Sequence, residues 1–105
     1  MAPQVFIIQD NGTRDFSKAR EFGELIPMIN RDVFPDDVKE RVSKIGSIIQ
    51  AKLKYFNPNT DYILLTGDPV AIILTGMCLM LNHSIEDVNL LKYDRENDAY
   101  YEVTV

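Results

Sequence analysis

Residues 61–76, DYILLTGDPVAIILTG, decide how this chain is expected to fold. The β-branched and apolar residues at 61–66 predict a buried strand, and residues 69–82 predict a helix that is apolar nearly all round. A Thr-Gly-Asp-Pro turn joins the two. Asp68 suits the N-cap of that helix, and Pro69 suits its first turn.

The same turn is a poor candidate for a phosphate-binding loop. It holds one glycine, no lysine, and no serine or threonine directly after it, so it lacks the residues that such a loop requires. The carboxylate of Asp68 at the helix start would also repel an anion. We therefore interpret Asp68 as a helix cap.

Composition restricts the class of protein. The chain has 105 residues, 46% of them hydrophobic and 26% charged, which is enough apolar content for one domain without a metal or disulfide. Its net charge of −5 repels phosphate backbones, so a nucleic-acid partner is not expected.

The start lacks the pattern of a signal peptide, and the 12-residue apolar stretch at 70–81 is too short to span a membrane. The single cysteine, Cys78, lies in that stretch and is expected to be buried and inert. These features predict a cytoplasmic protein without a membrane partner.

The remaining chain continues the alternation of strands and helices. Asp15 or Ser17 can cap a short helix that Gly23 ends. Residues 24–29, ELIPMI, could extend that helix, but Pro27 in its interior favours an edge strand. Further strands are expected at residues 4–9, 88–94 and 100–105, and a long amphipathic helix at 35–56.

This order predicts an α/β fold in one domain over residues 1–105. Short helical crossovers require parallel strand pairing in a small sheet that is covered on both faces. We expect a small Rossmann-like three-layer domain whose mostly parallel sheet ends in a C-terminal antiparallel hairpin strand.

Ligands of such folds bind beyond the carboxyl ends of the parallel strands. Three aspartates follow strands there, so they could hold Mg²⁺ and, through it, a phosphate group. The same aspartates are also ordinary cap and turn residues, and this interpretation explains them more simply. The candidate crevice residues are Asp10, Asn11, Thr66, Gly67, Asp68 and Asp94.

Other surfaces are candidates for contacts with partners. Arg41, Lys44 and Lys52 form a basic flank on the long helix, which a solvated helix flank explains equally well. The C-terminal strand could pair with its twin in a homodimer or be covered by a loop. Its candidate interface residues are Tyr100, Tyr101, Val103 and Val105.

Three residues of the apolar helix are expected in the core. Met77 and Met80 are interpreted as packing residues rather than as a binding surface. Gly76 costs helix stability, so a close backbone approach, for example to the sheet, is expected at that position.

The segments VFIIQ, DFSKAREFGEL, LLTGDP and VNLLKYDRENDAYYEV together resemble small α/β proteins encoded by tailed bacteriophages. The resemblance spans most of the chain and implies an accessory protein acting in the host bacterial cytoplasm, and no activity or site residue is carried over with it. The leading hypothesis is therefore a non-enzymatic binding or regulatory protein that acts through protein–protein contacts, without a cofactor. The alternative is a minimal Mg²⁺-dependent phosphoester- or nucleotide-binding enzyme that uses the strand-end aspartates.

Overall fold

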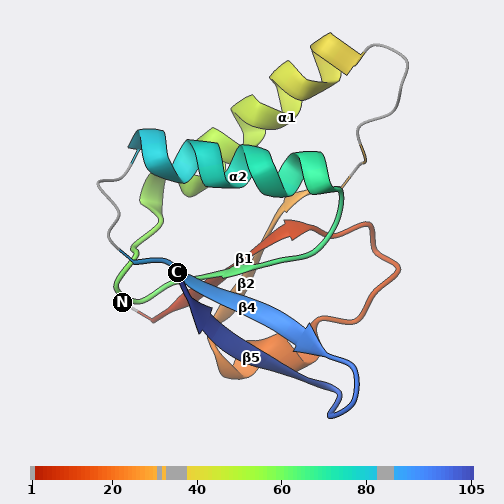
Figure 1. The fold of residues 1–105 in the computed structure, drawn as a ribbon, viewed down its shortest axis with the longest axis vertical. Helices are drawn as coiled ribbons and strands as arrows, with labels where there is room; N and C mark the ends of the chain where they lie inside the picture. The colour runs from red at the N-terminus through yellow and green to blue at the C-terminus, as the bar shows by residue number, and fades with distance from the viewer. Residues whose placement is uncertain (1, 31, 33–37, 83–86) are drawn as a thin grey trace.

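The computed structural model describes residues 2–30, 32, 38–82 and 87–105, and Figure 1 shows their arrangement. In chain order the elements are β1 (Gln4–Gln9), the 3₁₀ helix η1 (Ser17–Glu21), β2 (Glu24–Ile29), α1 (Val38–Lys52), the 3₁₀ turn η2 (Leu53–Tyr55), β3 (Tyr62–Leu64), α2 (Pro69–Asn82), β4 (Asn89–Asp94) and β5 (Ala99–Thr104).

The five strands form one sheet in the order β2-β1-β3-β4-β5. The first four strands are parallel, and β5 returns antiparallel to β4 with Leu90 opposite Val103. The chain thus starts at β1, next to the edge of the sheet, adds β2 on one side, and then crosses back to add β3, β4 and β5 on the other side. This is the doubly wound, Rossmann-like α/β arrangement that the sequence predicts, with its antiparallel hairpin strand at the C-terminus.

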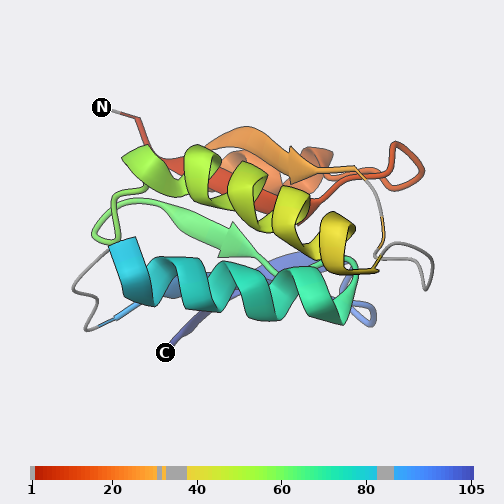
Figure 2. The same ribbon diagram turned by 90° about the horizontal axis from the view of Figure 1, so that it is seen from above.

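The reversal of strand order sets the layers. Crossover connections between parallel strands are right-handed. The connection from β1 to β2 runs in one direction along the sheet, and those from β2 to β3 and from β3 to β4 run in the other, so the two sets cover opposite faces. Figures 1 and 2 show the result: α1 and α2 lie side by side on one face, and η1 lies on the other. The three layers are therefore unequal, with two long helices on one side and one short 3₁₀ helix on the other.

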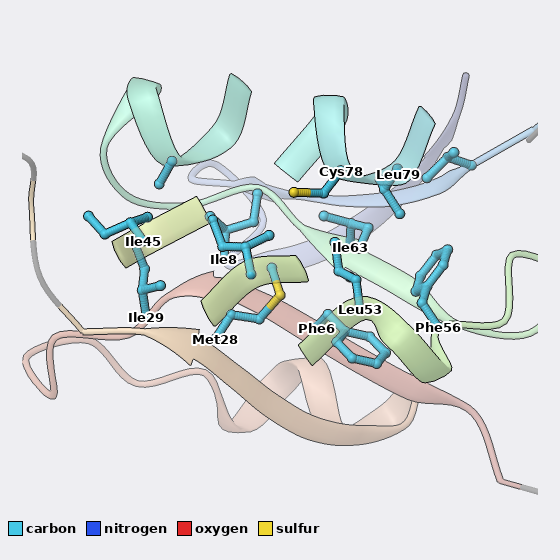
Figure 3. Close-up of a cluster of buried hydrophobic side chains, with 13 residues drawn as sticks. Phe6, Ile8, Met28, Ile29, Ile45, Leu53, Phe56, Ile63, Cys78 and Leu79 are labelled. Carbon is cyan, nitrogen blue, oxygen red and sulfur yellow. The ribbon is translucent and has the colours of Figure 1, made fainter. Parts of the chain in front are cut away.

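Each face of the sheet has its own apolar core. The larger cluster joins β1, β2 and β3 to the two helices and includes Phe6, Ile8, Ile49 and Ile63 (Figure 3). The smaller cluster packs η1 and Phe16 against Ile7 and Leu91 on the opposite face. Continuous apolar strands such as VFII fit this arrangement because both of their faces are buried.

The edge strand β2 confirms the preferred interpretation of residues 24–29. Pro27 is paired with Ile7 of β1 on one side only. A strand at the edge of a sheet tolerates the missing proline N–H, whereas a helix interior does not.

The ends of β4 and β5 differ from the sequence prediction by one residue, and two other elements differ by more. The long helix was expected over residues 35–56, but α1 ends at Lys52 and the chain tightens into the 3₁₀ turn η2; residues 35–37 lie outside the described residues. The strand β3 covers only Tyr62–Leu64, although the N–H of Leu65 still donates a hydrogen bond to the carbonyl oxygen of Leu91 on β4 at 3.0 Å.

The predictions for Met77, Met80 and Gly76 are wrong. Met77 is 56% exposed and Met80 is 82% exposed. A Cβ placed on Gly76 would meet no other atom within 4 Å, so no backbone approaches it. The reason is that α2 packs through one side only, and the residues on that side are Ala71, Thr75, Cys78 and Leu79.

Candidate functional site

Gln9, the last residue of β1, fills the place where a doubly wound sheet usually holds its ligand. That place is the carboxyl end of the two strands at which the strand order reverses, here β1 and β3. The side chain of Gln9 is only 3% exposed. Its Oε1 accepts a hydrogen bond from the backbone N–H of Asp68 at 2.7 Å, and its Nε2 donates to Oδ1 of Asn11 at 3.0 Å and to Oδ1 of Asp32 at 2.5 Å. The amide thus ties β1 to the start of α2 and to the chain after β2.

Gly67 allows this contact. Its φ of +106° favours glycine, and a Cβ at this position would lie 2.4 Å from both Cβ and Oε1 of Gln9. The glycine of the Thr-Gly-Asp-Pro turn therefore accommodates a side chain of the same protein. The sequence gives no signal for this role, because the contact joins residues 58 positions apart.

Asp68 occupies the N-cap of α2. Its Oδ1 accepts a hydrogen bond from the backbone N–H of Val70 at 2.9 Å, and its carbonyl oxygen accepts from the N–H of Ile72 at 3.1 Å. A negative carboxylate in this position is favoured by the helix dipole.

Asp10 and Thr66, two other candidate residues, also accept hydrogen bonds from the protein itself. The Oδ1 of Asp10 accepts a hydrogen bond from the backbone N–H of Gly12 at 2.9 Å, which is the geometry of an Asx turn. The hydroxyl oxygen of Thr66 accepts from Nη1 of Arg14 at 3.3 Å.

Asp94 is the last residue of β4, where it organises the turn between β4 and β5. Its carboxylate accepts a hydrogen bond from Nδ2 of Asn97 at 2.6 Å and one from the backbone N–H of Glu96 at 3.0 Å. These bonds, the Asn97 amide first, lower the pKa of Asp94 below its ordinary value.

The three aspartates thus occur in three separate local structures. Among the described residues, no three acidic, histidine or cysteine side chains are placed so that they could hold one metal ion. The use of Asp10, Asp68 and Asp94 as a Mg²⁺ site stays a prediction that the hydrogen bonds described above do not favour.

An open groove of about 820 Å³ runs between the end of β2 and α1. It brings Asp10 together with Arg41 and Lys44 of the basic flank, while Lys52 is not among the residues that line it. Lys44 also forms an ion pair with Glu40 at 3.1 Å, so the groove carries both signs of charge. Sequence spacing placed Arg41 and Lys44 on one helix flank, but their approach to Asp10 depends on how α1 crosses the sheet.

The most unusual surface is the side of α2 that faces away from the sheet. Val70, Ile73, Met77, Met80 and Leu81, with Gly76 among them, form what we call the outer face of α2. Ile73 and Leu81 are 65% and 79% exposed, and no residue of Pro69–Asn82 carries a charge. A helix that is apolar all round normally has both sides buried, and a contiguous exposed apolar patch commonly marks an interaction surface. Within the described chain, no helix is long and apolar enough to span a membrane.

The edge strand β5 is the other candidate contact surface. Its side chains divide between the two faces of the sheet. Tyr100 is buried in the smaller core, with its ring 5.4 Å from that of Tyr93, whereas Tyr101 and Val105 are exposed. Tyr100 therefore serves the core of the monomer, and its role in an interface is not favoured by this placement.

The fold and these surfaces define a small doubly wound α/β protein whose usual ligand position is filled by its own glutamine. The sequence model of the family described as Phage Pam3 gp32-like protein matches residues 3–105. The chain therefore belongs to that family, and the resemblance to small phage proteins is confirmed. Searches of curated proteins and of solved structures gave no match.

The packing of Gln9 against Gly67 can be tested by adding a methyl group. Gly67→Ala should lower the free energy of unfolding by about 1–3 kcal/mol, because the backbone is strained and the methyl displaces Gln9. Gly46→Ala is the matched control: its Cβ meets nothing within 4 Å, and its helical position should gain about 0.5–1 kcal/mol. Chemical denaturation measures both. Equal effects of the two substitutions would contradict the placement of Gln9.

Thermal unfolding in the presence of Mg²⁺ tests the strand-end aspartates. A site saturated at 100 times its dissociation constant would stabilise the protein by about 2.7 kcal/mol. We expect no shift, because each aspartate already accepts local hydrogen bonds. A stabilisation that Asp68→Asn abolishes would contradict this account, since asparagine keeps the helix cap and removes the charge.

Proposed function

We propose that this small phage protein is a binding or regulatory accessory protein of the host cytoplasm, and that it acts by protein–protein contact through the outer face of α2. The observation that carries the proposal is a 14-residue helix without a single charge whose outward side chains are mostly exposed. Burying these side chains against a partner would remove apolar surface from water, at about 25 cal/mol for each Å².

The chemistry of this face restricts its partner. A helix that lies on a lipid surface usually carries lysine or arginine on its polar side to meet anionic headgroups, and α2 has neither. Nucleic acids require positive charge, which α2 also lacks. The partner that fits is a protein surface about one helix long, apolar and uncharged.

Enzymatic or nucleotide-binding activity at the strand ends receives less support. At the position where a ligand would bind, the backbone N–H of Asp68 already donates a hydrogen bond to the side-chain amide oxygen of Gln9. Opening this position for a ligand would cost this part-buried hydrogen bond. The groove beside α1 has charges of both signs and no feature that selects a substrate.

A charge placed on the outer face of α2 tests the proposed function. Met77→Glu should leave the fold intact because the side chain is already exposed, and it should reduce the yield of the phage that carries the gene. Tyr101→Glu is the control: Tyr101 is 43% exposed and lies opposite Lys92 on β4, so an acid is readily accommodated there.

The measurement is the relative yield in mixed infection with unmodified phage, alongside a deletion of the gene that sets the size of the full defect. Circular dichroism and thermal unfolding verify that both variants are folded. A folded Met77→Glu variant with undiminished yield would refute a functional role for this face. A defect with Tyr101→Glu alone would assign the contact to β5 instead.

A further inference from the structure

We infer that the partner of the outer face of α2 is a second copy of this chain, with α2 packed against its twin about a twofold axis. This inference rests on the proposed function and names the partner at the same surface. The observations that carry it are the spacing of the exposed side chains, the absence of charge and the packing of the opposite side of α2 against the rest of the chain.

The exposed residues of α2 repeat with the spacing of a helix-pairing stripe. Val70, Ile73, Met77 and Met80 follow one another at intervals of three, four and three residues. This is the a and d pattern by which two helices interlock their side chains. Gly76 and Leu81 flank the stripe, and neither is charged. Gly76 has open space where a Cβ would be, so a second helix can approach closely on that side.

The net negative charge of the chain favours contact between two copies through the outer face of α2 rather than through other surfaces. The chain has a net charge of −5, so two copies repel each other over most of their surfaces. Among the residues that the structure describes, the outer face of α2 offers an uncharged surface at which two identical molecules can meet. A twofold axis also requires a patch that is complementary to itself, and an apolar stripe containing two flexible methionines meets that condition.

The helix is already ordered, which lowers the cost of pairing. Two heptads are too short to form a stable coiled coil from unfolded chains. Here α2 is held against the sheet by Ala71, Thr75, Cys78 and Leu79, so association does not need to order the backbone. A 14-residue helix is about 21 Å long, and its stripe buries less than the ~800 Å² per partner of a standard interface. We therefore expect a dimer that dissociates on dilution.

Cysteine cross-linking tests this arrangement in the full chain. Ile73→Cys and Met77→Cys place thiols on the stripe on either side of the midpoint of α2. Parallel twins bring each position next to itself, and antiparallel twins bring residue 73 next to residue 77. Oxidation of an equimolar mixture of the two variants should therefore yield a disulfide-linked dimer in either orientation.

Two controls separate the outcomes. The unmodified chain contains only Cys78, which is buried, so oxidation should produce no disulfide-linked dimer from it. Tyr101→Cys places an exposed thiol on β5, so it should not cross-link, and a dimer formed by this variant alone would overturn the inference in favour of pairing through β5. Absence of any cross-link on α2 would equally overturn the inference. The proposed function would survive that result if Met77→Glu still reduced phage yield, because the partner would then be a different protein.

Discussion

The constraint on which the rest of the structure depends is that a single layer of helices on a sheet can bury only one side of each helix. In α2 both sides are apolar, but only the side that includes Ala71 and Leu79 has a surface of the same chain to pack against. The other side remains in contact with water, at a cost that grows with its apolar area. Fourteen uncharged residues in such a position support our proposal that a partner covers the second side.

The carboxyl end of β1 and β3, where the strand order reverses, is occupied by Gln9, and this argues against a ligand site there. Doubly wound folds bind ligands where the strand order reverses because the loops there diverge and leave a crevice. In this protein the side chain of Gln9 extends from β1 into that crevice, where its Oε1 accepts a hydrogen bond from the backbone N–H of Asp68 at the start of α2. The hydrogen bonds that a ligand phosphate would receive in other proteins of this architecture are thus made within the chain. Fold alone does not determine function, and in our proposal the sheet serves to present the exposed helix α2.

Local sequence patterns were sufficient to predict where the helices and strands lie, but not to predict the contacts that they make with distant parts of the chain. β1 and α2 lie at their predicted positions because a strand of apolar residues, a capping aspartate and a proline in the first turn each act within a few residues. Pro27 identified an edge strand for the same reason. Two features depended on distant contacts instead: the hydrogen bond between Gln9 and Asp68, and the buried carboxylate of Asp61, which accepts from the backbone N–H groups of Gln4 and Asn57 at 2.9 Å each.

The errors at Met77 and Met80 have a physical cause of their own. Hydrophobicity shows that a side chain is suited to burial, but it does not show whether the surface that buries it belongs to the same molecule. A soluble core and a subunit interface therefore look alike along α2. The charge pattern alone could have raised the question, since a surface helix of a monomer normally has a polar side.

Sedimentation equilibrium over a wide range of protein concentration tests the central claim most directly. Our account predicts that the mass rises with concentration from 12.0 kDa toward twice that value, and that Met77→Glu holds it at the monomer mass. A mass that remains at 12.0 kDa at the highest concentration would contradict the claim that a second copy covers α2.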